Sequence, residues 1–282
     1  MRLHIWHITF GLCFVLFGTT GHARLLVTST QPLYLIAQAV TQGVEQPTLL
    51  IPANQDGHHI QIRPEDRKTL QQADLVIWVG AEYEAALVQL LRDHPNAVAL
   101  SAPAHRIQRL VARELDGQPR PNTLDPHLWL SPYNAVFTAH LIANLRAAQY
   151  PEHAVRYRQN AQAFTERLVK AVGTVPPHGK PYWAYHDAYQ YIERYAGVRL
   201  AAALTADPEL PPTAKQIQWL RQHRPSTTPC ILTEGHAPRA LIQRLMPVNH
   251  VLIDETMRDA KDFISGWTTL RDRIQLCVGA RD

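Results

Sequence analysis

Short apolar runs alternate with amphipathic stretches along the chain after residue 23. The apolar runs have the composition of strands buried in a parallel sheet, and the amphipathic stretches repeat their apolar residues with the period of a helix. In the first half the expected strands are 25–28, 48–51, 75–79 and 97–100, with helices at 32–40, 64–72 and 82–91. In the second half the expected strands are 182–185, 198–204, 230–233 and 251–253, with helices at 188–195, 213–223, 239–245 and 263–277. This alternation predicts an α/β protein with two (β/α)4-type lobes, each built on a parallel sheet.

A long helix is predicted between the two halves. No Gly or Pro occurs between Pro151 and Gly173. The apolar residues that recur there at helical spacing are Ala154, Tyr157, Ala161, Phe164, Leu168 and Val172. A helix of about 22 residues is about 33 Å long, enough to run the height of a small domain. We therefore expect an N-terminal lobe at 24–150, a linker helix at 151–174 and a C-terminal lobe at 175–282.

The first residues are typical of a signal peptide. Arg2 precedes the apolar run 8–17, which is too short to span a bilayer because a spanning helix needs about 20 residues. Gly21 and Ala23 supply the small side chains expected at the −3 and −1 positions of a cleavage site. We predict that residues 1–23 are removed and that the mature protein is periplasmic. A buried strand or an uncleaved anchor is the alternative.

The cysteines fit an exported protein. Cys13 belongs to the predicted signal peptide, and a Leu at the preceding position argues against lipid attachment there. Two cysteines then remain, Cys230 and Cys277, and in an oxidising compartment a disulfide between them is expected. By lowering the conformational entropy of the unfolded chain, the bond would stabilise the folded protein by about 4 kcal/mol. Two buried free thiols are the alternative.

The overall composition narrows the class of protein. The hydrophobic fraction of 46% and the charged fraction of 18% are those of a folded, water-soluble protein. The formal net charge is only +4, and no run of Lys or Arg with interleaved aromatic residues occurs. The composition therefore argues against a disordered chain, a multi-span membrane protein and a nucleic-acid partner.

Several histidines lie near the carboxyl ends of expected strands, where parallel sheets commonly bind ligands. His186 and Asp254 each directly follow an expected strand, His58 follows another after a short loop, and His127 lies just ahead of an expected helix. Ligands of open parallel sheets collect beyond the carboxyl ends of the strands, so these side chains could share one crevice. The residues alone leave two interpretations open, which are ordinary hydrogen-bonded histidines and a metal site between the lobes.

Four local strings carry a family resemblance. They are GHHIQIRPED (57–66), QQADLVIWVG (71–80), DPHLWLSP (125–132) and HDAYQY (186–191). Together they resemble the periplasmic zinc-binding proteins of ABC importers, the ZnuA-type family. The similarity runs in order from about residue 25 to about residue 280. It implies two α/β lobes joined by a long rigid helix, with a metal ion in the cleft between them.

The resemblance also assigns the ligands. The first ligand histidine lies six residues before the Pro of the RP string, which selects His58 rather than His59. The second is the histidine of the HLWLSP string, His127, and the third opens the HDAY string as His186. The fourth position matches Asp254, a place that is taken in some family members by water or by an acid next to the first histidine, where this chain has Gly57. One zinc ion per monomer with tetrahedral coordination is expected.

The implied partners are a membrane permease and its ATPase, to which a monomeric binding protein hands zinc without catalysing a reaction. A manganese-binding transport protein of the same fold is one alternative. A three-histidine zinc hydrolase is another, although the sequence offers no convincing general base. The segment 103–126 holds only His105, which argues against a zinc-gathering role for it. Glu234 is expected to support or pack rather than to bind metal, and Asp187 to cap the following helix.

Overall fold

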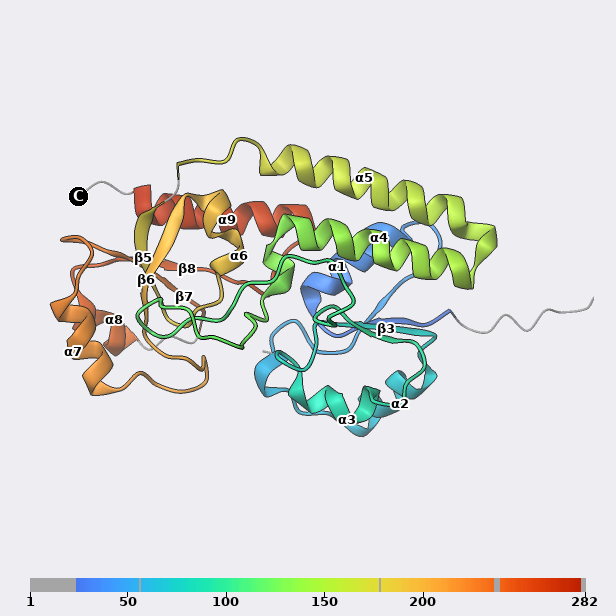
Figure 1. The fold of residues 1–282 in the computed structure, drawn as a ribbon, viewed down its shortest axis with the longest axis horizontal. Coiled ribbons are helices and arrows are strands. Elements are labelled where there is room, and N and C mark those ends of the chain that lie inside the picture. The colour runs from blue at the N-terminus through green and yellow to red at the C-terminus, as the bar shows by residue number, and fades with distance from the viewer. Residues whose placement is uncertain (1–23, 56, 178, 236–238, 280–282) are drawn as a thin grey trace, which may run out of the picture.

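Two parallel sheets with flanking helices make up the molecule, and Figure 1 shows them side by side. The computed structural model describes residues 24–55, 57–177, 179–235 and 239–279. The predicted α/β class with two parallel-sheet lobes is confirmed. The predicted signal peptide, residues 1–23, lies outside the described residues. Among the residues that are described, no helix has the length and apolar character needed to cross a membrane.

The first sheet has the strand order β2-β1-β3-β4. Its strands are β1 (Leu26–Thr28), β2 (Thr48–Leu49), β3 (Leu75–Trp78) and β4 (Ala97–Ala99). The helices between them are α1 (Gln31–Thr41), α2 (Pro64–Gln72) and α3 (Val88–Leu91). The central strands β1 and β3 are buried along their whole length, as their continuous apolar sequences predict. The helix expected at 82–91 is shorter, because Ala85–Leu87 forms a 3-10 turn ahead of α3.

The second sheet repeats this arrangement. Its strands are β5 (Lys180–Ala184), β6 (Val198–Ala203), β7 (Cys230–Thr233) and β8 (Asn249–Leu252), in the order β6-β5-β7-β8. Its helices are α6 (Gln190–Ala196), α7 (Ala214–Gln222), α8 (Arg239–Leu245) and α9 (Phe263–Gly279). In both sheets the first and third strands are central, so each lobe has its topological switch point beyond the carboxyl ends of those strands.

Two long helices lie side by side over the first lobe, and one of them reaches the second lobe (Figure 1). Figure 1 shows α5 (Ala154–Val172) lying along α4 (Pro132–Gln149) and continuing toward α9. The buried side chains of α5 are Tyr157, Ala161, Phe164 and Leu168, four of the six apolar positions that predict this helix; the other two, Ala154 and Val172, are half-buried. Residues at its expected start, Pro151–His153, form a 3-10 turn instead. Because the rings of Phe164 and Phe263 lie 5.7 Å apart, α5 also packs on the C-terminal helix.

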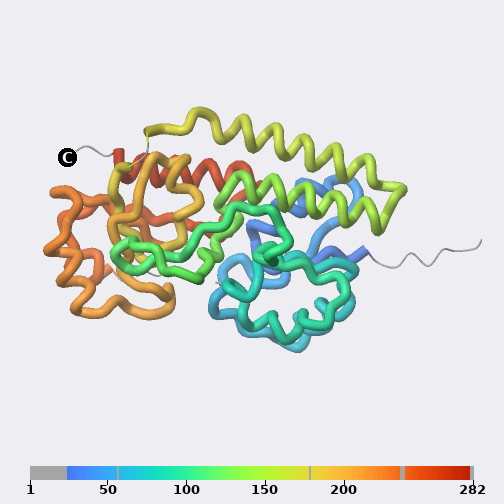
Figure 2. Tube along the Cα trace, in the orientation of Figure 1, coloured from blue at the N-terminus to red at the C-terminus, as the bar shows by residue number. Residues whose placement is uncertain are grey.

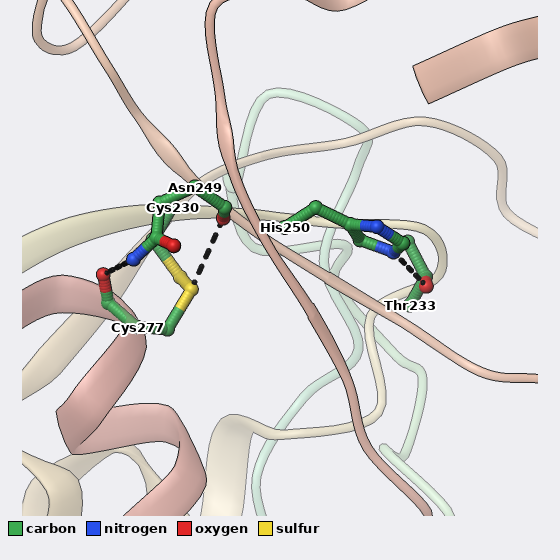
Figure 3. The surroundings of a disulfide bond; sticks show 5 residues. All are labelled: Cys230, Thr233, Asn249, His250 and Cys277. Atoms are coloured by element: carbon green, nitrogen blue, oxygen red, sulfur yellow. Dashed lines mark hydrogen bonds between the residues drawn. A yellow bond between two sulfur atoms is a disulfide. The ribbon is translucent and has the colours of Figure 1, made fainter. Parts of the chain in front are cut away.

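A disulfide fixes α9 to the second sheet. Cys230 in β7 and Cys277 in α9 are bonded, as predicted from the cysteine count, with their Cα atoms 5.4 Å apart (Figure 3). The amide of Asn249 in β8 donates a hydrogen bond to the carbonyl of Cys277 beside it. The last helix is therefore held both covalently and by a hydrogen bond to the neighbouring strand.

Replacing both cysteines by alanine is expected to lower the free energy of unfolding by about 4 kcal/mol. The physical reason is the larger conformational entropy of an unfolded chain that lacks the crosslink between positions separated by 47 residues. Denaturant unfolding of the parent and the double alanine variant measures the difference. Equal midpoints and equal slopes for the two proteins would contradict this expectation.

Candidate metal centre

The three predicted histidines meet where the two lobes face each other. His58 lies on a 3-10 turn, Gly57–His59, in the connection that follows β2. His127 lies immediately before another 3-10 turn, Leu128–Leu130, that leads into α4. His186 follows β5 directly, at the switch point of the second sheet. One ring nitrogen from each of the three lies within 4.8 Å of the others, close enough for all to bind one ion.

His127 is oriented by a buried carboxylate. Oδ1 of Asp125 lies 2.8 Å from Nδ1 of His127 and accepts the backbone N–H of the same histidine at 3.0 Å. A neutral imidazole that donates from Nδ1 has its lone pair on Nε2, and this nitrogen lies 3.4 Å from Nε2 of His186. Burial raises the pKa of Asp125 to about 7. This carboxylate–histidine pair is the arrangement that fixes the tautomer of metal-binding histidines.

Two aromatic side chains, Tyr83 and Trp129, pack in a row beside the ring of His58. Its ring packs edge-on against Tyr83, with the centroids 4.5 Å apart, and Tyr83 packs in turn on Trp129 at 4.9 Å. Gly57 makes this contact possible, because a Cβ atom at that position would come within 2.2 Å of the Tyr83 ring. The neighbouring His59 turns the other way, and its Nε2 lies 2.9 Å from Oδ1 of Asp207. The prediction that selected His58 over His59 therefore agrees with where the two rings lie.

Asp254, the predicted fourth ligand, does not join the three histidines. Its Oδ1 accepts the backbone N–H of Thr256 at 3.1 Å, and its Oδ2 accepts the backbone N–H of Arg258 at 2.8 Å. The carboxylate thus stabilises the turn that follows β8 and is partly exposed. The structure instead buries the next residue, Glu255, which reaches toward His186.

Glu234 and Glu255 form a second group with His186. Oε1 of Glu234 lies 3.3 Å from Nδ1 of His186, the ring nitrogen opposite the one that faces His127. Carboxylate oxygens of both acids lie within 4.8 Å of a nitrogen of His186 and of each other. Sequence reasoning assigned no role to Glu255. The usable signal was the alternation of side chains at the end of a strand, which points Ile253 and Glu255 inward and Asp254 outward.

The segment 103–126 covers the histidines and joins the lobes. Figure 2 shows it in green, running from the first lobe across to the second. Its Arg113 donates to both carboxylate oxygens of Asp187, at 2.7 and 2.6 Å, and to Glu193 at 2.8 Å. The carbonyl of Leu115 accepts the N–H of Ala203 in β6 at 2.8 Å. Asp187 therefore holds Arg113, and the expectation that it caps α6 is wrong.

A small cavity opens onto the three histidines beneath this segment. It has a volume of about 170 Å³ and is bordered by Glu82, Arg113, Glu114 and Arg120 in addition to the histidines. Pockets for organic ligands usually have volumes of about 300 to 1,000 Å³. The space beside the histidines therefore suits an ion with a few water molecules better than an organic substrate.

Two zinc-uptake proteins are similar to this chain in sequence. The high-affinity zinc uptake system protein ZnuA of Brucella abortus (strain 2308) is 27% identical over 271 residues, which covers 80% of this chain and 81% of that protein. The protein of the same name from Yersinia pestis is 30% identical over 223 residues and covers 70% of each chain.

Solved structures share the fold. The periplasmic zinc-binding protein TroA from Treponema pallidum matches with a TM-score of 0.73 at 20% identity, over 90% of this chain and 99% of that one. The protein FpvC from Pseudomonas aeruginosa, solved in complex with Mn²⁺, matches with a TM-score of 0.73 at 18% identity, over 91% and 99%. The model of the family ZnuA, described as zinc-uptake complex component A, periplasmic, matches residues 26–261. Because this match spans most of the chain, the protein belongs to the ZnuA family.

Proposed function

We propose that this protein binds a zinc ion in the periplasm and delivers it to an ABC importer in the membrane. The observation that carries the proposal is the meeting of three histidine nitrogens, from His58, His127 and His186, within 4.8 Å of one another. The family match and the names of the similar zinc-uptake proteins support the same function. The proposed partners are the permease and the ATPase of that importer, and the proposed stoichiometry is one zinc ion per monomer.

Three neutral imidazoles favour zinc over manganese. Zinc is a borderline-soft ion that accepts nitrogen ligands at low coordination number, whereas manganese is held better by carboxylate and carbonyl oxygens. A manganese transporter's binding lipoprotein, PsaA of Streptococcus pneumoniae, is 27% identical over 197 residues, so manganese is the second candidate. The nitrogen-rich set of this chain favours zinc.

Binding rather than catalysis is the better use of this site. A hydrolase needs room for substrate beside the zinc-bound water, and the cavity of about 170 Å³ offers little. Asp125 cannot act as a free general base, because its Oδ1 already interacts with His127 at two atoms. The carboxylate of Asp254 stays in its turn, where it accepts hydrogen bonds from Thr256 and Arg258. For this reason we propose that a water molecule occupies the fourth metal position.

His58→Ala is expected to weaken zinc binding by more than about 100-fold, because even partners outside the coordination shell cost about 10 to 100-fold when removed. His59→Ala is the matched control from the same turn. It is expected to weaken zinc binding less than about fivefold, since an exposed pair such as His59–Asp207 is worth at most about 1 kcal/mol. Competition titration with a chelator measures both, and the same titration with manganese ranks the two metals. Equal effects of the two substitutions would refute the assignment of His58.

Zinc affinity is expected to fall steeply below about pH 6. A histidine binds metal only when neutral, and its reference pKa is about 6.5, so protons compete with zinc as the pH falls and are released as zinc binds. Calorimetry at pH 7.5 and pH 5.5, in two buffers of different ionisation enthalpy, measures both effects. An affinity that does not change between these conditions would mean that carboxylates hold the ion.

Asp254→Asn is expected to change zinc affinity less than about tenfold, the lower bound for losing a partner of a metal ligand. The reason is that the carboxylate already accepts hydrogen bonds from Thr256 and Arg258. Zinc titration of the variant tests this expectation. A loss as large as that of His58→Ala would make Asp254 the fourth ligand, as the sequence predicts.

A further inference from the structure

Two carboxylates are buried on the far side of His186 from the other histidines. Glu234 follows β7 and Glu255 follows β8, so both come from the carboxyl ends of neighbouring strands. The exposed fractions of His186, Glu234 and Glu255 are 3%, 6% and 4%. Two acids brought this close in a buried place repel each other when both are ionised.

Apart from His186, whose Nδ1 lies 3.3 Å from Glu234, few described groups compensate these charges. Oε1 of Glu234 accepts a hydrogen bond from the hydroxyl of Tyr189. Oε2 of Glu234 and Oε2 of Glu255 are buried without any hydrogen-bond partner among the described residues. The described Lys and Arg side chains make no ion pair with either acid. A buried carboxylate oxygen without a partner is costly, and a bound ion is one of the few ways to satisfy it.

Ions can reach the two acids by their own route. A second cavity, of about 440 Å³, is lined by Glu234, Glu255, Asp254 and Glu209 from the second lobe and by Asn54 and Gln55 from the first. The cavity that opens onto the three histidines does not include these residues. The second cavity is also lined by Arg258, which lies 4.0 Å from Asp254, but its four acids outnumber this cation and offer the oxygen ligands that a hard divalent cation prefers.

We propose that Glu234, Glu255 and Nδ1 of His186 form a second divalent-cation position, suited to an oxygen-preferring ion such as manganese. This position rests on the proposed function in one respect, because it shares His186 with the three-histidine site. A neutral imidazole has one lone pair, so metal on Nε2 leaves a proton on Nδ1, facing Glu234, and metal on Nδ1 leaves a proton on Nε2, facing His127. The two positions therefore exclude each other at His186.

The surroundings of Glu255 agree with this position. Its carboxylate is buried beside that of Glu234. A divalent cation between the two acids would offset the charge of both. The carbonyl of Glu255 accepts a hydrogen bond from the indole N–H of Trp129 at 2.8 Å, so its backbone is fixed while the side chain faces His186.

The test uses the full mature chain with His58→Ala and His127→Ala together, which leaves His186 and both acids in place. Titration with Mn²⁺ alone, followed by the paramagnetic resonance of the free ion, is expected to show one bound ion per chain. Adding Glu255→Gln is expected to weaken this binding at least about tenfold. Glu209→Gln, an exposed acid of the same cavity, is the matched control and is expected to change it less than about threefold.

Absence of bound manganese in the double variant, or binding that Glu255→Gln leaves unchanged, would overturn the proposal. Circular dichroism checks that each variant folds. Should the double variant not fold, the parent decides, because one equivalent of zinc should displace one bound manganese and Glu255→Gln should remove the manganese but not the zinc. Zinc binding that survives His58→Ala would count against the proposed function alone, so the two failures are distinguishable.

Discussion

Nε2 of His127 and Nε2 of His186 lie 3.4 Å apart in a buried site, although the two side chains come from different lobes. Two lone pairs at this separation repel each other unless a proton or a metal ion lies between them. When both rings are neutral and carry their protons on Nδ1, the pair therefore does not hold the lobes together in the absence of metal. Other contacts must therefore fix the lobes in this position.

Those contacts are buried and cross from one lobe to the other. The indole N–H of Trp129 donates to the carbonyl of Glu255 at 2.8 Å, and that of Trp267 donates to the carbonyl of Leu130 at 2.9 Å. Breaking either bond would leave a buried donor and acceptor unpaired, at about 1 to 3 kcal/mol each. Arg113 adds ion pairs to the second lobe from the covering segment. The histidines are thus positioned in advance, so zinc binding need not supply this ordering energy.

Periodic patterns and local strings predicted most of what the structure contains. Strands and helices followed from alternating apolar runs because burial in a parallel sheet selects such runs. The positions of His58, His127 and His186 followed from the family strings. What the sequence interpretation missed rests on single residues. It selects Asp254 instead of the neighbouring Glu255, although the alternation of side chains at the strand end favours Glu255, and the segment 103–126 has no periodicity from which its contacts could be derived.

The proposed ligands are divided between the lobes, and this division bears on how an ion would be released. Of the proposed ligands, His58 and His127 belong to the first lobe and His186 to the second, so a separation of the lobes would take one of the three away from a bound ion. The exposed His59–Asp207 pair resists such a separation weakly, because water screens it. The buried contacts of Arg113 with Asp187 and Glu193 hold the covering segment to the second lobe, beside the proposed third ligand His186. A separation of the lobes that keeps this segment on the first lobe would break these contacts and leave charges in a partly desolvated place.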